Sequence, residues 1–259
     1  MDSRIKVWKN IILIIFVIVS ACSHKNIEKS PLEKEYESLH NIKLIDTFSN
    51  ELRFVPCNYI TEIKFFPIYI GRQKNSLLLT YTLQDKNYLS SGNYKPADSS
   101  DLIIFVDTSK IVGSAYNFNV LPPPPPPYFT EKEIIEWETK TKKERGKLFR
   151  GGLKSYPVII KNMKNDTLFM GYEFEELPII IEAKDSIGKW GPITRNSIMK
   201  CVHSSIYYFL SPKEILITNC MLFEGSYYTK MRLVFGNRLK IYSNEFYGTI
   251  DYKQFDEIK

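Results

Sequence analysis

The chain has 259 residues, of which 44% are hydrophobic and 14% aromatic, enough for one large domain or two of ordinary size. This composition excludes a chain that is disordered throughout. The formal net charge is +6, but basic and acidic residues are interleaved and no Lys/Arg block is present, so we expect no nucleic-acid partner.

Residues 1–21 have the order of a signal peptide. Three cationic residues, Arg4, Lys6 and Lys9, precede an unbroken apolar run over residues 11–19, and small residues follow it. The apolar run is shorter than the roughly 20 residues that a membrane-spanning helix needs. The pattern therefore predicts an export signal that is removed.

The tetrad Val19-Ser20-Ala21-Cys22 resembles the lipobox of bacterial lipoproteins. The resemblance implies that the Cys22 thiol takes a diacylglyceryl group and that the chain is cut just before it. Two acyl chains are enough for stable anchoring, so the chain would stay on a membrane without spanning it. Ser23, in place of Asp, implies the outer membrane, and we expect the periplasmic face. The alternative is a plain secretory signal whose cleavage site includes a cysteine.

Residues 22–40 are polar and charged, which predicts a tether or at most a short helix that holds the following domain away from the lipid. Beyond Cys22, three cysteines remain, Cys57, Cys201 and Cys220. An exported chain can form disulfides, and Cys201 with Cys220 is the candidate pair because both belong to the same predicted domain. The alternative is three buried thiols.

Residues 41–121 predict a smaller, β-rich N-terminal part. Short runs of β-branched and aromatic residues are separated by Asn, Lys, Gly, Asp and Ser. We predict strands over residues 42–45, 52–55, 63–70, 77–83 and 102–106.

Residues 122–152 connect this part to the rest of the chain. Six prolines at 122–127 cannot join a sheet and predict polyproline II, as a ligand for an aromatic-lined partner or as a stiff spacer. Thr130-Glu131-Lys132-Glu133 has the pattern of a capping box, and Gly151-Gly152 supplies a stop. We predict one connecting helix over residues 131–148.

Residues 153–259 predict an antiparallel β-sandwich, because short apolar runs alternate with turn residues. The predicted strands are residues 158–160, 168–172, 179–183, 189–193, 207–210, 214–222, 228–235 and 239–247. The segment Leu210-Ser211-Pro212-Lys213-Glu214 resembles the turn that opens a late strand in immunoglobulin-like bacterial domains. The fold class expected is mainly β, with this sandwich at the C-terminus.

A weak internal repeat links the two β parts. Phe66-Pro67-Ile68-Tyr69-Ile70 and the turn after it resemble Tyr156-Pro157-Val158-Ile159-Ile160 and the turn that follows. Duplication of one unit and convergence of two β-hairpins both explain the pattern. The sequence alone leaves open whether the two β parts form one unit or two.

No motif predicts a catalytic residue, a cofactor or a metal site. Cys201-Val202-His203 brings a thiol near an imidazole but lacks the second ligand pair that a zinc site needs. Glu173-Phe174-Glu175-Glu176 offers paired carboxylates, as a glycoside hydrolase would use.

The sequence thus favours a lipid-anchored cell-envelope protein that binds or scaffolds and is not an enzyme. The expected partners are the membrane, through the lipid, and an envelope protein or glycan. The seventeen tyrosines and three tryptophans suit a wet binding face, but they are also ordinary strand residues, and the second interpretation is favoured. The alternatives are a hydrolase that acts on envelope glycan or peptide through Glu173–Glu176, and a protease-inhibitor-like module that presents a rigid loop.

Overall fold

The structure is a computed structural model of the chain, and it describes residues 29–46, 52, 54, 65–79, 95–96, 101–114, 130–137, 139, 153–172, 177–195, 207–236 and 240–256. Contacts divide the chain into two compact units, one that ends at Ser38 and one that begins at Leu39. Each unit is described by itself.

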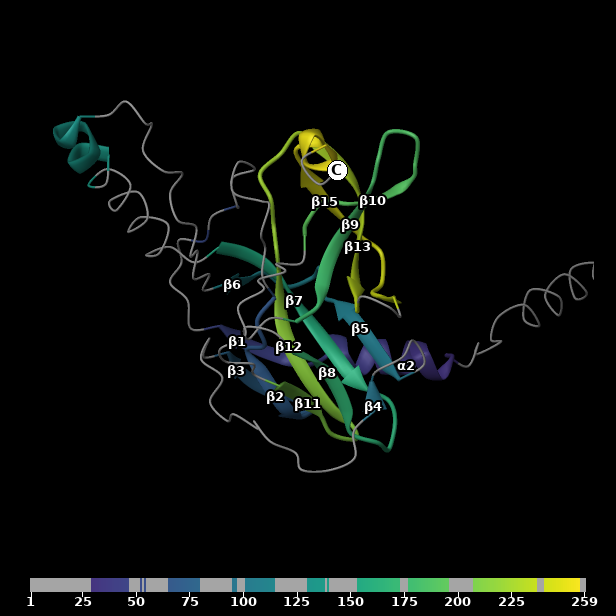
Figure 1. Cartoon of the computed structure of the whole chain (residues 1–259). Helices are drawn as coiled ribbons and strands as arrows, with labels where there is room; N and C mark the ends of the chain where they lie inside the picture. The colour runs from purple at the N-terminus through teal and green to yellow at the C-terminus, as the bar shows by residue number, and fades with distance from the viewer. Residues whose placement is uncertain are drawn as a thin grey trace, which may run out of the picture. The chain divides into compact units, whose positions relative to one another are not determined.

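The described elements are mainly β-strands (Figure 1). In chain order they are α2 (Pro31–His40), β1 (Lys43–Asp46), β2 (Tyr69–Arg72), β3 (Ser76–Leu79), β4 (Lys95–Pro96), β5 (Leu102–Val106), β6 (Val112–Ser114), β7 (Leu153–Asn162), β8 (Leu168–Tyr172), β9 (Ile179–Lys184), β10 (Trp190–Pro192), β11 (Tyr207–Leu210), β12 (Glu214–Met221), β13 (Tyr227–Phe235), β14 (Ile241–Tyr242), β15 (Phe246–Ile250) and the 3₁₀ turn η2 (Tyr252–Phe255).

The first large sheet, called here the β12 sheet, is antiparallel. Strand β12 lies between β2 and β7, and the other edge of β7 pairs with β5 and β6 in succession. Its register aligns Leu216 with Ile160 and Ile160 with Ile104 across three strands. The predicted N-terminal part supplies β2, β5 and β6 to this sheet and the predicted sandwich supplies β7 and β12, so the two β parts share one sheet.

The second large sheet, called here the β13 sheet, is also antiparallel. Strand β9 lies between β10 and β13, and the far edge of β13 pairs with β14 and then β15. Gly188, with a φ of +80°, forms the tight turn between β9 and β10. Two smaller sheets complete the described topology: β11–β8–β4, and the parallel pair β1–β3.

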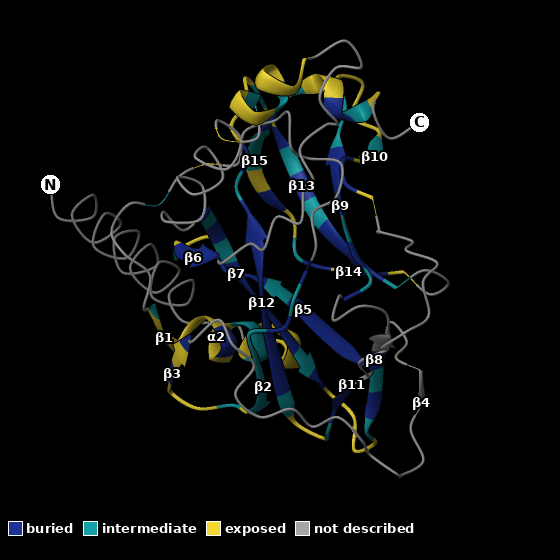
Figure 2. Cartoon of the chain, turned by 60° about the vertical axis from the view of Figure 1, so that its left-hand side comes forward, coloured by how far each residue is buried: buried dark blue, intermediate teal, exposed yellow. Residues whose placement is uncertain are grey.

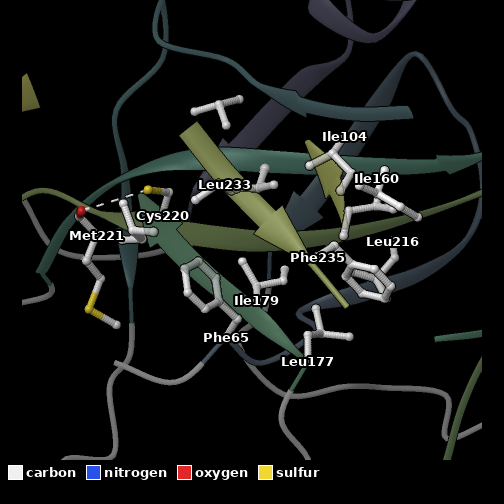
Figure 3. Close-up of a cluster of buried hydrophobic side chains, with 14 of the residues drawn as sticks. Phe65, Ile104, Ile160, Leu177, Ile179, Leu216, Cys220, Met221, Leu233 and Phe235 are labelled. Atoms are coloured by element: carbon white, nitrogen blue, oxygen red, sulfur yellow. Dashed lines mark hydrogen bonds between the residues drawn. The ribbon is translucent and has the colours of Figure 1, made fainter. Parts of the chain in front are cut away.

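The main core lies between the two large sheets, because each turns one side of its strands inward. Met231, Leu233 and Phe235 alternate along β13 and are buried, and they belong to one cluster with Leu216 of β12 and Ile160 of β7. Figure 3 shows Leu233 and Phe235 meeting Leu216 and Ile160 between the crossing strands. Full burial of each such side chain contributes roughly 1.5–3 kcal/mol, so this interface dominates stability.

The other side of the β12 sheet is buried as well. Ile103, Ile159, Ile215 and Ile217 are at most 6% exposed, and the Phe105 ring on this side meets His40 with ring centroids 6.4 Å apart. Strands covered on both faces are apolar at consecutive positions. This explains the unbroken run Val158–Ile160, which alternation along a half-buried strand would not produce.

The prediction of a mainly β chain is confirmed, and the immunoglobulin-like topology stays a prediction. Strands β5, β8 and β11 have the predicted bounds. The single strand predicted over residues 239–247 is wrong, because β14 and β15 are separated by Ser243–Glu245. The strand predicted over residues 63–70 starts later, at Tyr69, although Phe65 forms an isolated bridge to Leu177.

The two α-helix starts among the described residues each have a glutamate that accepts from the N-cap backbone, which is one half of a capping box. Thr130 N–H donates to the Glu133 carboxylate at 2.8 Å, and residues 131–137 and 139 are helical; the rest of the predicted helix lies outside the described residues. Helix α2, expected as a tether or short helix, begins with the complete box. Ser30 N–H donates to Glu33 at 2.7 Å, and Glu33 N–H donates to Ser30 Oγ at 3.2 Å.

Candidate binding surface

The outer face of the β13 sheet carries the largest group of interacting aromatic and charged side chains that we find among the described residues. Because side chains alternate along a strand, the residues between the core positions of β13 point away from the core. Figure 2 shows this alternation of buried and less buried residues along the sheet. The face comprises Trp190, Glu182, Lys184, Tyr228, Lys230, Arg232, Lys240, Tyr242, Glu245 and Tyr247.

Arg232 is the centre of one half of this face. Its guanidinium carbon lies 4.2 Å from the ring centroid of Trp190 and 4.0 Å from that of Tyr242. Its Nε and Nη2 both donate to Glu182 Oε2, at 2.9 and 2.6 Å. The register places Arg232 directly opposite Glu182. This half is a fixed stack in which arginine and tryptophan already have partners.

Two stacked tyrosines form the other half. The rings of Tyr228 and Tyr247 are 5.3 Å apart and nearly parallel, at 11°. Lys230, paired with Tyr247 across the strands, donates to Glu245 at 2.9 Å and lies 5.8 Å from the Tyr247 ring. This half leaves both rings open to solvent, with Tyr228 66% exposed and Tyr247 49% exposed, whereas Tyr242 of the arginine stack, 44% exposed, already has Arg232 against its ring.

The charges on the face act on one another. The hydrogen bond to Glu245 raises the pKa of Lys230, and the bond from Lys230, with further attraction from Lys184 and Arg232, lowers the pKa of Glu245. Both groups are solvent-exposed, so the pairing orients side chains more than it stabilises the fold. The arrangement can present two flat rings and several cations to a ligand without rearrangement.

A second polar cluster surrounds Asp107, at the end of β5. The carboxylate is 1% exposed, accepts from Ser109 N–H and Oγ at 3.1 and 2.6 Å, forms an ion pair with Lys110, and lies 3.3 Å from His40 Nδ1. Ser, His and Asp meet here, but the serine donates to the carboxylate. A catalytic serine donates to the imidazole, so this cluster has the geometry of a turn held by its carboxylate.

Most residues singled out in the sequence lie outside the described residues: the predicted lipidation site Cys22, Cys57, Cys201 and His203, prolines 122–127, and the carboxylates of 173–176. Cys220 is described: it is fully buried, and its Sγ lies 4.0 Å from the Met221 carbonyl oxygen (Figure 3). Burial raises the pKa of Cys220 to about 12. Its pairing with Cys201 stays a prediction.

Within the described ranges, no helix is both long enough and apolar enough to cross a membrane. Across those same ranges, no three His, Cys, Asp or Glu side chains gather in a way that suits a metal ion.

The sequence also contains a signal for the binding surface. In β13 the pattern Tyr228-x-Lys230-x-Arg232 alternates with Met231, Leu233 and Phe235, which is the period of a strand with one buried face. The pattern does not show the strand pairing that brings Trp190, Tyr242 and Tyr247 close to these residues of β13. No family model, curated protein or solved structure matches the chain.

Proposed function

We propose that this protein is a lipid-anchored cell-envelope protein that binds an envelope component through the outer face of the β13 sheet, and that its role is binding or scaffolding without catalysis. The anchor is Cys22, and the location is the outer membrane, facing the periplasm. The lipobox supports the anchor, and the exposed tyrosine pair supports the binding role.

The observation that carries the binding role is the exposure of Tyr228 and Tyr247 in a fixed geometry. Exposing the apolar faces of an aromatic ring to water costs free energy, which a ligand that covers the ring recovers. Because the two rings are already held parallel on adjacent strands, they lose little side-chain conformational entropy when a ligand binds. The nearby Lys230–Glu245 pair supplies polar groups at the rim. Such a face is pre-organised for a ligand that is both partly apolar and well hydrated.

One experiment tests the anchor. The Cys22→Ser substitution should abolish incorporation of a fatty-acid label and release the protein from the membrane fraction, because no other thiol has the lipobox context. Cys57→Ser is the matched control and should keep label and location. A Cys22→Ser protein that keeps its label would refute the anchor.

A second experiment tests binding. The wild-type chain should sediment with envelope material from which the lipids have been extracted. Tyr228→Ala with Tyr247→Ala should reduce the affinity for this material about tenfold, since two ring contacts of about 0.7 kcal/mol each are lost. Leu78→Ala, an exposed residue of β3, is the control and should bind as the wild type does. Equal sedimentation of all three proteins would remove the binding role from this face.

A further inference from the structure

The charged groups around the tyrosine pair indicate what kind of ligand fits it. The face holds four cations, Lys184, Lys230, Arg232 and Lys240, and two carboxylates. Arg232 and Glu182 neutralise each other, and Lys230 pairs with Glu245. Lys184 and Lys240 are left as a cationic surplus; Lys240 lies 3.9 Å from Glu182, whose carboxylate Arg232 already holds. The face is therefore complementary to a negatively charged ligand.

The exposed aromatic side chains narrow the chemical class of the ligand further. On the strands of this sheet, the exposed large hydrophobic residues are Tyr228, Tyr242 and Tyr247, and no aliphatic side chain is exposed there among the described residues. A tyrosine ring is a flat apolar surface with a hydroxyl at its edge. A sugar ring has the matching form, with an apolar face of C–H groups and a rim of hydroxyls.

A protein partner fits this face less well. Desolvated protein interfaces are depleted in Lys and Glu and rely on Trp, Tyr and Arg anchors. Lysines and glutamates make up half of this face, while Trp190 and Arg232 are engaged with each other. The tyrosines are thus the available aromatic groups, and the groups around them are strongly hydrated.

We propose that the outer face of the β13 sheet binds an acidic polysaccharide, with sugar rings stacked on Tyr228 and Tyr247 and the carboxylates of the polymer held by Lys184 and Lys240. This inference rests on the proposed binding function and gives its ligand a chemical class.

The test uses the full chain purified in detergent and immobilised for binding measurements. The probes are polygalacturonate, an acidic polysaccharide; dextran, a neutral one; and poly-glutamate, an acidic peptide. We expect polygalacturonate to bind more tightly than both others, and its affinity to fall as salt is raised from 50 to about 500 mM, because the lysine contacts are screened.

Variants assign the contacts. Tyr228→Ala with Tyr247→Ala should weaken polygalacturonate binding about tenfold, whereas Tyr228→Phe, which keeps the ring, should bind within about twofold of the wild type. Lys184→Gln with Lys240→Gln should weaken binding and flatten its salt dependence. Lys74→Gln, an exposed lysine between β2 and β3, is the matched control and should change neither. Unchanged thermal melting of each variant shows that the fold is intact.

The outcomes separate the two proposals. Poly-glutamate binding as tightly as polygalacturonate, or polygalacturonate binding that survives loss of both tyrosines, overturns the polysaccharide inference. A second outcome is that the wild type fails to bind polygalacturonate and yet sediments with envelope material in a way that the double tyrosine substitution abolishes. In that case the proposed ligand class is wrong, while the proposed binding function stands. Failure of both measurements rejects both.

Discussion

Asp107 shows how a single buried carboxylate is kept charged. Burial raises the pKa of Asp107, but the hydrogen bonds from Lys110 and Ser109 and the charge of Lys110 outweigh it, so the pKa of this group lies below its ordinary value. The carboxylate holds the turn from 107 to 110, and His40 lies against the same oxygen as Ser109. The cluster therefore ties the residue that ends α2 to the turn after β5.

We expect Asp107→Asn to lower the free energy of unfolding by about 2 kcal/mol at pH 7, because Lys110 loses a charged partner. A carboxyl whose folded pKa is lowered stabilises the fold above its unfolded pKa, near 4, and loses that contribution as the pH falls through the folded pKa. The difference between wild type and variant should thus shrink below about pH 4. Urea unfolding at pH 7 and pH 3 measures it.

Asp185→Asn provides the matched control for this prediction. Asp185 accepts two backbone hydrogen bonds, from Ile187 and Lys189, in the turn between β9 and β10. An asparagine oxygen can accept the same bonds, so the change should stay within about 0.5 kcal/mol. An equal loss in both variants would contradict the special role of Asp107.

At the scale of elements, the connection between β12 and β13 carries the chain from one large sheet to the other. It contains Gly225, whose position leaves no room for a side chain. A Cβ there would lie 2.7 Å from Asp251 N and would overlap the carbonyl group of Ile250, at the end of β15. The glycine lets this connection pass directly against the backbone that follows β15.

Gly225→Ala should therefore destabilise the protein by about 2–3 kcal/mol, since backbone atoms must move to admit the methyl group. Gly188→Ala gives the comparison: its Cβ would meet nothing within 4 Å, and only its left-handed φ of +80° resists the change, at about 1 kcal/mol. Chemical denaturation of both variants measures the difference. A smaller loss at Gly225 than at Gly188 would contradict the steric argument.

Composition predicted most individual strands but not how they pair. Runs such as Leu102–Val106 are apolar enough to identify a buried strand without knowledge of its neighbours. The break between β14 and β15 was missed because its cause is tertiary. The Asn244 side chain accepts from Val106 N–H and donates to its carbonyl oxygen, at 2.7 and 3.1 Å, and so bonds to the end of β5 in the other sheet.

The same limit applies to the candidate surface. Composition is compatible with an aromatic binding face but does not distinguish it from ordinary strand residues, and the alternation in β13 indicates only its middle strand. The stack of Arg232 on Trp190 and Tyr242 depends on three separate strand pairings. Which strands pair, and in which register, depends on how all the strands pack together, and a single sequence does not reveal this packing.

At the scale of the whole molecule, the early and late parts of the chain are interleaved in the β12 sheet. We expect a fragment of residues 153–259, the predicted sandwich, not to fold alone, because β7 and β12 would lose β2, β5 and β6 and expose their isoleucines to water. Residues 39–259 should unfold cooperatively. Near-UV circular dichroism and dye binding distinguish the two, and a cooperatively folding 153–259 fragment would contradict the expectation.

The pairing of Tyr69 with Ile217 has a consequence for how the protein is made. If residues 1–21 act as the export signal that we predict, the chain passes through a translocation channel from its N-terminus. Strand β2 then emerges long before β12, its only strand partner among the described residues. The backbone N–H and C=O groups of β2 therefore lack their hydrogen bonds to β12 until most of the polypeptide has crossed the membrane. Maturation in the periplasm would then be a late, all-at-once event, and the half-delivered chain would depend on holding chaperones to escape aggregation.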